Sequence, residues 1–133
     1  MISSVRKFFQ RKPLVVVIRL DGVIGAVSRF GSGGVDDSNT QKLLEKAFEF
    51  EKAKAIAIKI NSPGGSPTQS SLIASRILKL SEEKKIPVLC FCEDVAASGG
   101  YWLACAGEEI YSDIKSIIGS IGVISASFGF SEL

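Results

Sequence analysis

Histidine is absent from all 133 residues of the sequence. Its absence excludes a Ser-His-Asp triad and a Cys-His dyad built within this chain. It also removes the commonest zinc ligand. A nucleophilic serine in this protein would need a different general base, and a lysine with a lowered pKa is the usual substitute.

Cysteine is scarce as well, with three residues and no C-x-x-C spacing of the kind that binds zinc. Cys90 and Cys92 alternate along an apolar run, so both side chains should point to one face of a strand. Cys105 falls in an apolar helical pattern. We therefore predict three buried free thiols in a reducing compartment.

The chain also lacks any apolar run long enough to cross a bilayer. The first twelve residues contain four basic residues and no acidic residue. Because the whole chain has a net charge of +2, the remaining residues carry a net charge of −2. This distribution argues against nucleic-acid binding. It predicts a basic tail over 1–12, for which a solvated tail, contact with an anionic membrane surface and an organelle transit segment stay open. We favour the membrane contact, in a protein that is cytoplasmic or peripheral on the inner face of a membrane.

The apolar pattern predicts one α/β domain with a mostly parallel sheet and right-handed crossovers. The main strands are expected at 14–20, 55–60 and 88–92, and shorter ones at 23–27, 109–111 and 117–125. Helices are expected at 40–52, 68–84, 101–106 and from 127 onward. Residues 28–39 predict a loop that ends in an N-cap at Ser38 or Asn39.

Ser98 lies in the segment AASGG, between the third main strand and an apolar helix. A hydroxyl at such a junction is close to unpaired helix N–H groups, which favour negative charge. The small neighbours let a substrate backbone approach closely. This setting suits a nucleophile that generates an oxyanion, and a helix N-cap in a small-residue turn is the structural alternative.

A second glycine-bearing turn, NSPGG, follows the second main strand. Because sites in open parallel sheets form outside the carboxyl ends of strands, both turns should lie at one edge of the sheet. Gly64 and Gly65 can aim backbone N–H groups at a ligand oxygen. Asn61 and Ser62 are expected to hold the turn through side-chain hydrogen bonds. Taken alone, the segment also fits an ordinary turn.

Three motifs in this order, NSPGG, DVAASGGYWLACA and GSIGVIS, resemble the signal peptide peptidase A (SppA/SohB-like) family of serine peptidases. The resemblance runs from residue 14 to residue 133. It implies the Clp protease/crotonase-like fold, which is an α/β fold with a mostly parallel sheet and repeated β-β-α units. It implies no metal and no cofactor.

The resemblance also implies roles for particular residues. Ser98 would be the nucleophile, and Gly64 or Gly65 would act with Gly99 as oxyanion donors. Ser120 of the GSIG motif would line the same site.

The general base of the family is a lysine some tens of residues beyond the GSIG motif, and Lys115 precedes that motif, so the role is not transferred to it. We expect 13–133 to be the N-terminal part of a peptidase domain whose lysine lies beyond residue 133. The implied reaction is Ser-Lys hydrolysis of cleaved signal peptides or short apolar peptides. The implied assembly is a homo-oligomeric ring.

Two alternatives stay open. Without the lysine, the chain would be a catalytically incompetent fragment or a non-catalytic peptide-binding subunit. A crotonase-like enzyme acting on acyl-CoA thioesters would use paired glycine N–H groups without a special need for Ser98.

Several residues near these motifs are interpreted as structural. Glu93 and Asp94 are expected to be solvated turn residues. Arg19, inside an apolar strand, is expected to pair with Asp21 or with a neighbouring subunit. The aromatic residues at 101 and 102 are expected to pack against the sheet or a neighbour.

Overall fold

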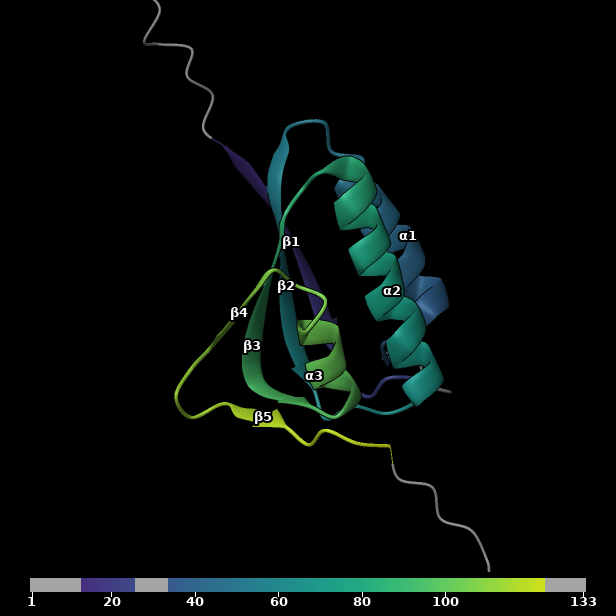
Figure 1. The fold of residues 1–133 in the computed structure, drawn as a ribbon, viewed down its shortest axis with the longest axis vertical. Helices are drawn as coiled ribbons and strands as arrows, with labels where there is room; N and C mark the ends of the chain where they lie inside the picture. The colour runs from purple at the N-terminus through teal and green to yellow at the C-terminus, as the bar shows by residue number, and fades with distance from the viewer. Residues whose placement is uncertain (1–12, 26–33, 124–133) are drawn as a thin grey trace, which may run out of the picture.

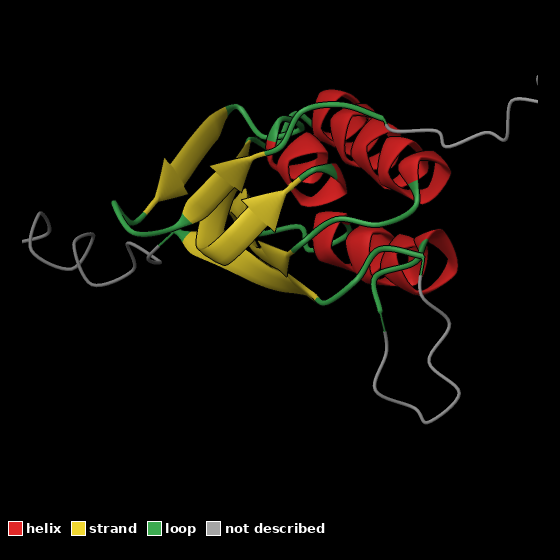
Figure 2. Cartoon of the chain, turned by 90° about the horizontal axis from the view of Figure 1, so that it is seen from below, coloured by secondary structure: helices red, strands yellow, loops and turns green. Residues whose placement is uncertain are grey.

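The computed structural model describes residues 13–25 and 34–123 as one parallel sheet with helices on one of its faces (Figures 1 and 2). Strands and helices alternate along most of the chain. In order they are β1 (Leu14–Asp21), α1 (Asp37–Phe48), β2 (Ala53–Ser62), α2 (Pro67–Lys84), β3 (Val88–Ala97), α3 (Gly99–Ala104), β4 (Glu109–Ser112) and β5 (Ile117–Gly119).

The sheet has the strand order β1-β2-β3-β4, and each of these pairs is parallel. β3 is long enough to have two partners on the same side. Its first half pairs with β4, and its second half pairs with β5 through Val95, Ala96 and Ala97 (Figure 1). β5 therefore holds the carboxyl end of β3 just before the chain reaches Ser98.

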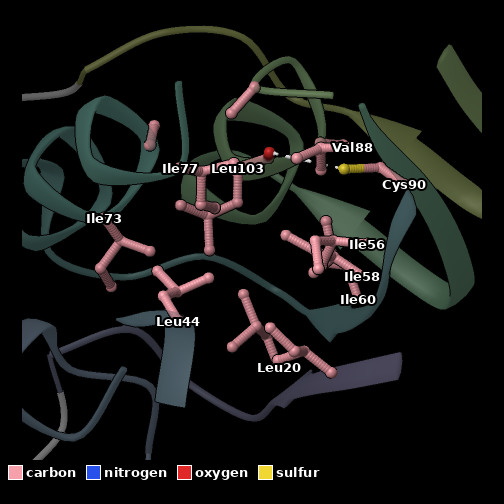
Figure 3. Packing of buried hydrophobic residues seen from close by; sticks show 14 of the residues in the cluster. Leu20, Leu44, Ile56, Ile58, Ile60, Ile73, Ile77, Val88, Cys90 and Leu103 are labelled. Carbon is pink, nitrogen blue, oxygen red and sulfur yellow. Dashed lines mark hydrogen bonds between the residues drawn. The ribbon is translucent and has the colours of Figure 1, made fainter. Parts of the chain in front are cut away.

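The hydrophobic core lies between the sheet and the helices (Figure 3). Alternate residues of β2 point toward the helices because successive strand side chains face opposite sides. The largest fully buried aliphatic side chains of β2, α1 and α2 are Ile56, Ile58, Ile60, Leu44, Ile73 and Ile77. Burial of each contributes roughly 1.5–3 kcal/mol, which fixes the face of the sheet that the helices cover.

The alternation of strands and helices was predicted correctly, but the first helix was misplaced. α1 begins at Asp37 rather than at Thr40, because Asp36 is its N-cap instead of Ser38 or Asn39. The Asp36 carboxylate accepts a hydrogen bond from the Asn39 backbone N–H at 2.9 Å. The hydrogen bonds from Ser38 and Asn39 also lower the pKa of Asp36 below the usual range of an aspartate.

Other boundaries also differ from the prediction. α1 ends at Phe48 instead of continuing to Lys52. Of the strand expected at 23–27, the described residues 23–25 form only a bridge at Ile24, and residues 26 and 27 lie outside the described ranges. β3 continues to Ala97 because β5 pairs with its end. The basic tail, most of the predicted loop and the helix expected from 127 lie outside the described residues.

The face of the sheet opposite the helices carries a cluster of ion pairs. Arg19 lies 3.4 Å from Asp21, as predicted, and 3.0 Å from Glu93. Lys59 lies 2.6 Å from the other Glu93 oxygen. The prediction of Glu93 and Asp94 as turn residues was wrong, because both belong to β3. The Lys59 hydrogen bond and the Arg19 charge hold the pKa of Glu93 below its usual range.

Candidate active site

Ser98 occupies a sharp junction between β3 and α3, with φ 52° and ψ −119°. A positive φ is uncommon for a residue with a side chain and is often found at functional sites. The Ser98 N–H donates to the Gly119 carbonyl of β5 at 2.8 Å, and the Ser98 carbonyl accepts from the Trp102 N–H at 3.0 Å. Both sides of the Ser98 backbone are therefore fixed.

The Ser98 hydroxyl does not act as a helix cap, since its side chain makes no capping hydrogen bond to α3. Ser98 lines a cavity of about 360 Å³. The walls come from the Gly65 turn, from α3 and from the segment after β5, and they include Pro67, Trp102 and Ile121. The volume and the apolar walls fit the side chain of a ligand placed beside the hydroxyl.

The Gly64–Gly65 turn is held by the backbone of Ile24. The Ile24 N–H donates to the Gly64 carbonyl at 2.8 Å, and the Ser66 N–H donates to the Ile24 carbonyl at 2.8 Å. In this parallel bridge, Gly65 lies between the two bonded groups and turns its own N–H to the opposite side. Gly65 is also one of the residues that line the Ser98 cavity.

The N–H of Gly64 is already used, because it donates to Ser62 Oγ at 3.1 Å. The predicted side-chain support of this turn is thereby confirmed for Ser62. Asn61 instead accepts a hydrogen bond from the Val95 N–H at 3.2 Å, which ties β2 to β3. Among the described residues, the N–H groups of Gly65 and Gly99 have no acceptor.

Three of the five predicted site residues, Ser98, Gly65 and Gly99, line the same cavity. Gly64 and Ser120 do not line it. Gly64 nevertheless packs against Ser98, since a Cβ built on Gly64 would lie 2.8 Å from the Ser98 Cβ. Ser120 directly follows the Gly119 carbonyl that binds the Ser98 N–H.

The prediction that Cys105 is buried was wrong. α3 ends at Ala104, so Cys105 is the C-cap residue and turns outward, where its exposed side chain lines the Ser98 cavity. Cys90 and Cys92 are buried as predicted, and burial raises the pKa of the Cys90 thiol to about 12. Trp102 lies at the cavity wall with 43% exposure, and its packing against a neighbouring subunit stays a prediction.

Sequence reasoning missed the contribution of Ile24 to this site. Its signal was weak, because one isolated bridge leaves no alternating pattern. No lysine within the described ranges, 13–25 and 34–123, lines the cavity. The same part of the chain brings together no group of three potential metal-ligating side chains, and it contains no helix long and apolar enough to cross a bilayer.

The parallel sheet, the helices on one of its faces and the serine at a strand–helix junction fit the Clp protease-like fold. A serine-to-alanine mutant of the 1510-N membrane-bound stomatin-specific protease has a similar structure, with a TM-score of 0.58 and 23% sequence identity. The similarity covers 92% of this chain and 53% of that one. This likeness establishes the fold.

Residues 81–133 match the model of peptidase family S49, and SppA and protease relatives at 30–37% identity support an SppA-like serine peptidase family for this chain. The chloroplastic serine protease SPPA of Arabidopsis thaliana is 37% identical over 90% of this chain and 18% of its own length. A putative signal peptide peptidase SppA of Enterococcus faecium is 30% identical over 90% of this chain and 35% of its own length.

A Brucella melitensis protein named Na(+)/H(+) antiporter NhaA is 50% identical over 96% of this chain. The matched region is 17% of that protein. The chain thus spans between 17% and 35% of the length of these curated relatives.

Proposed function

We propose that this chain carries the nucleophile and the oxyanion hole of a serine peptidase. The observation that carries the proposal is the position of Ser98, which lines a cavity together with two glycines whose N–H groups have no acceptor among the described residues. In the proposed reaction, Ser98 Oγ attacks a peptide carbonyl to form an acyl-enzyme, and water then releases the acyl group.

The proposed oxyanion hole consists of the N–H groups of Gly65 and Gly99. Of the two glycines in the first turn, Gly65 is favoured because the Gly64 N–H is bound to Ser62. Two donors from separate turns can bind the negative oxygen of a tetrahedral intermediate. Loss of one such donor typically lowers the rate by about 100- to 1,000-fold.

The proposed general base is the lysine that the family resemblance implies beyond the GSIG motif. Its neutral amine would take the Ser98 proton during attack and deliver that proton to the leaving amine. The absence of a lysine from the cavity walls in 13–25 and 34–123 supports a base from another part of the protein.

The proposed substrates are cleaved signal peptides or other short apolar peptides. The apolar walls around Ser98 support this class, and an extended peptide would add as a strand beside the site. Assembly into a homo-oligomeric ring and contact of the basic residues 1–12 with a membrane belong to the same proposal.

The test uses a fluorophosphonate probe, which phosphonylates activated serines, on the intact protein. We expect labelling of the wild type and of Ser81→Ala, and none of Ser98→Ala. Ser81 is a suitable control because its hydroxyl donates to the Ile86 carbonyl, away from the cavity. Peptide binding without labelling would favour the non-catalytic alternative. Acyl-CoA turnover that survives Ser98→Ala would favour the crotonase-like alternative.

A further inference from the structure

A buried hydroxyl in α2 lies beside Gly99 and is bonded to the residue that follows Gly65. The Ser70 side chain is fully buried, with 0% exposure. Its Oγ donates to the Ser66 carbonyl at 2.8 Å, and its backbone N–H donates to the same carbonyl at 3.0 Å. Ser66 directly follows Gly65 and is the N-cap of α2. The Ser70 hydroxyl is therefore tied to the end of the first turn.

The same hydroxyl packs against the second turn. A Cβ built on Gly99 would lie 2.3 Å from Ser70 Oγ and 3.3 Å from Ser70 Cβ. The Ile24 side chain would be the next neighbour, at 3.1 Å. Gly99 thus rests directly on Ser70, and one side chain contacts the supports of both donors.

We propose that Ser70 is a positioning residue that sets the separation between the N–H groups of Gly65 and Gly99. The inference rests on the function proposed above. The two donors belong to different elements, so their separation depends on how closely the first turn of α2 approaches the first turn of α3. An oxyanion needs both donors at about 2.7–3.1 Å, so a small change in that approach weakens the hole.

Serine suits this position for two reasons. Its side chain is small enough to let Gly99 approach α2, and its hydroxyl is buried without loss because it is hydrogen-bonded. Alanine would remove the bond to Ser66 and leave space below Gly99. Threonine would keep the hydroxyl but add a methyl group in a packed region. Both changes should move Gly99 relative to Gly65, in opposite directions.

The test measures two quantities in the intact protein: the rate constant for phosphonylation of Ser98 and the affinity for a non-covalently bound product peptide. We expect Ser70→Ala and Ser70→Thr each to lower the rate about tenfold, because small misplacements cost catalysis more than binding. The product affinity should stay within a factor of two of wild type in both variants. Thermal unfolding identifies the variants that are folded.

Ser81→Ala is the matched control, since it also removes the hydroxyl of an α2 serine that donates to a backbone carbonyl, here that of Ile86. It should react at the wild-type rate. Wild-type rates in both folded Ser70 variants, or equal losses of rate and affinity, would overturn the proposed role of Ser70. Neither outcome would contradict the proposed function. If only one variant folds, its rate decides the question. An unreactive wild type would overturn the proposed function and this inference together.

Discussion

The two glycine turns of the candidate site look alike in sequence but depend on glycine for different reasons. Each follows the carboxyl end of a parallel strand, and each precedes a helix. In the first turn, Gly65 has φ +150°, and its backbone is fixed by hydrogen bonds on both sides of Ile24. The first turn therefore requires glycine for its backbone conformation in addition to space, because a Cβ on Gly65 would also clash with the Ile24 backbone.

The second turn requires glycine for space. Gly99 and Gly100 lie in the first turn of α3 and have no positive φ. A Cβ on Gly99 would meet the Ser70 side chain, and a Cβ on Gly100 would lie 2.5 Å from the Ser62 backbone oxygen. Substitutions in the first turn should therefore disturb folding, whereas Gly99 substitutions should mainly disturb the geometry of the site.

Gly65→Ala should have the largest effect. The new Cβ would lie 2.1 Å from the Ile24 carbonyl oxygen, and the backbone conformation is unfavourable for alanine. We expect a loss of about 3–5 kcal/mol in the free energy of unfolding, together with loss of Ser98 labelling. Chemical denaturation of the intact protein measures the first quantity.

The control for this change is Gly107→Ala, where the new Cβ would lie 2.8 Å from the Cys90 sulfur and away from the cavity. A side-chain sulfur can move more easily than a backbone carbonyl, so the loss of stability should be smaller. Equal losses in the two variants would show that Ile24 does not constrain the first turn as described.

Gly99→Ala should separate activity from stability. Overpacking against Ser70 costs about 1–3 kcal/mol, so the protein should remain folded. The rate of Ser98 phosphonylation should fall on the order of 100-fold, because the Gly99 N–H is displaced from the oxyanion position. In a Ser70→Ala background the added loss should be smaller, since the closest clash is removed. Strictly multiplicative losses in the double variant would contradict this contact.

The sequence predicted the features of this site that depend on local patterns. Ser98 was placed at a strand–helix junction because an apolar β-prone run precedes it and an apolar helical pattern follows. The two turns were placed at one edge because parallel strands align their carboxyl ends. These inferences need only neighbouring residues and the handedness of the crossovers.

The features that were missed depend on contacts between distant segments. The length of β3 is set by pairing with β5, and the choice of Gly65 over Gly64 as a donor depends on the bonds that Ile24 and Ser62 make to this turn. The exposure of Cys105 depends on where α3 stops, which local helical propensity does not fix. No periodicity in the sequence indicates that Ser70 contacts Gly99.

Ser62→Ala tests the link between the two turns. It removes the acceptor of the Gly64 N–H and leaves that buried group unpaired, which costs about 1–3 kcal/mol. The Ser62 backbone oxygen still contacts Gly100 in this variant, so the second turn should keep its shape. Denaturation should report the loss, and the phosphonylation rate should fall less than in Gly99→Ala. A larger loss of rate than in Gly99→Ala would mean that the first turn controls the site more strongly than the second.

Glu93→Gln should have the smallest effect and marks the limit of the site. Glu93 lies on β3 upstream of Ser98, but it faces Arg19 and Lys59 on the open side of the sheet. Exposed ion pairs contribute below about 1 kcal/mol, so the loss of stability at neutral pH should be small.

Because the pKa of Glu93 is lowered in the folded protein, its contribution is present at neutral pH and disappears as the pH falls below the usual range of a glutamate. The difference in unfolding free energy between wild type and Glu93→Gln should therefore vanish in acid, while the phosphonylation rate at neutral pH stays unchanged. A difference that persists in acid would assign the Glu93 contribution to packing, and a changed rate at neutral pH would extend the site to the open face of the sheet.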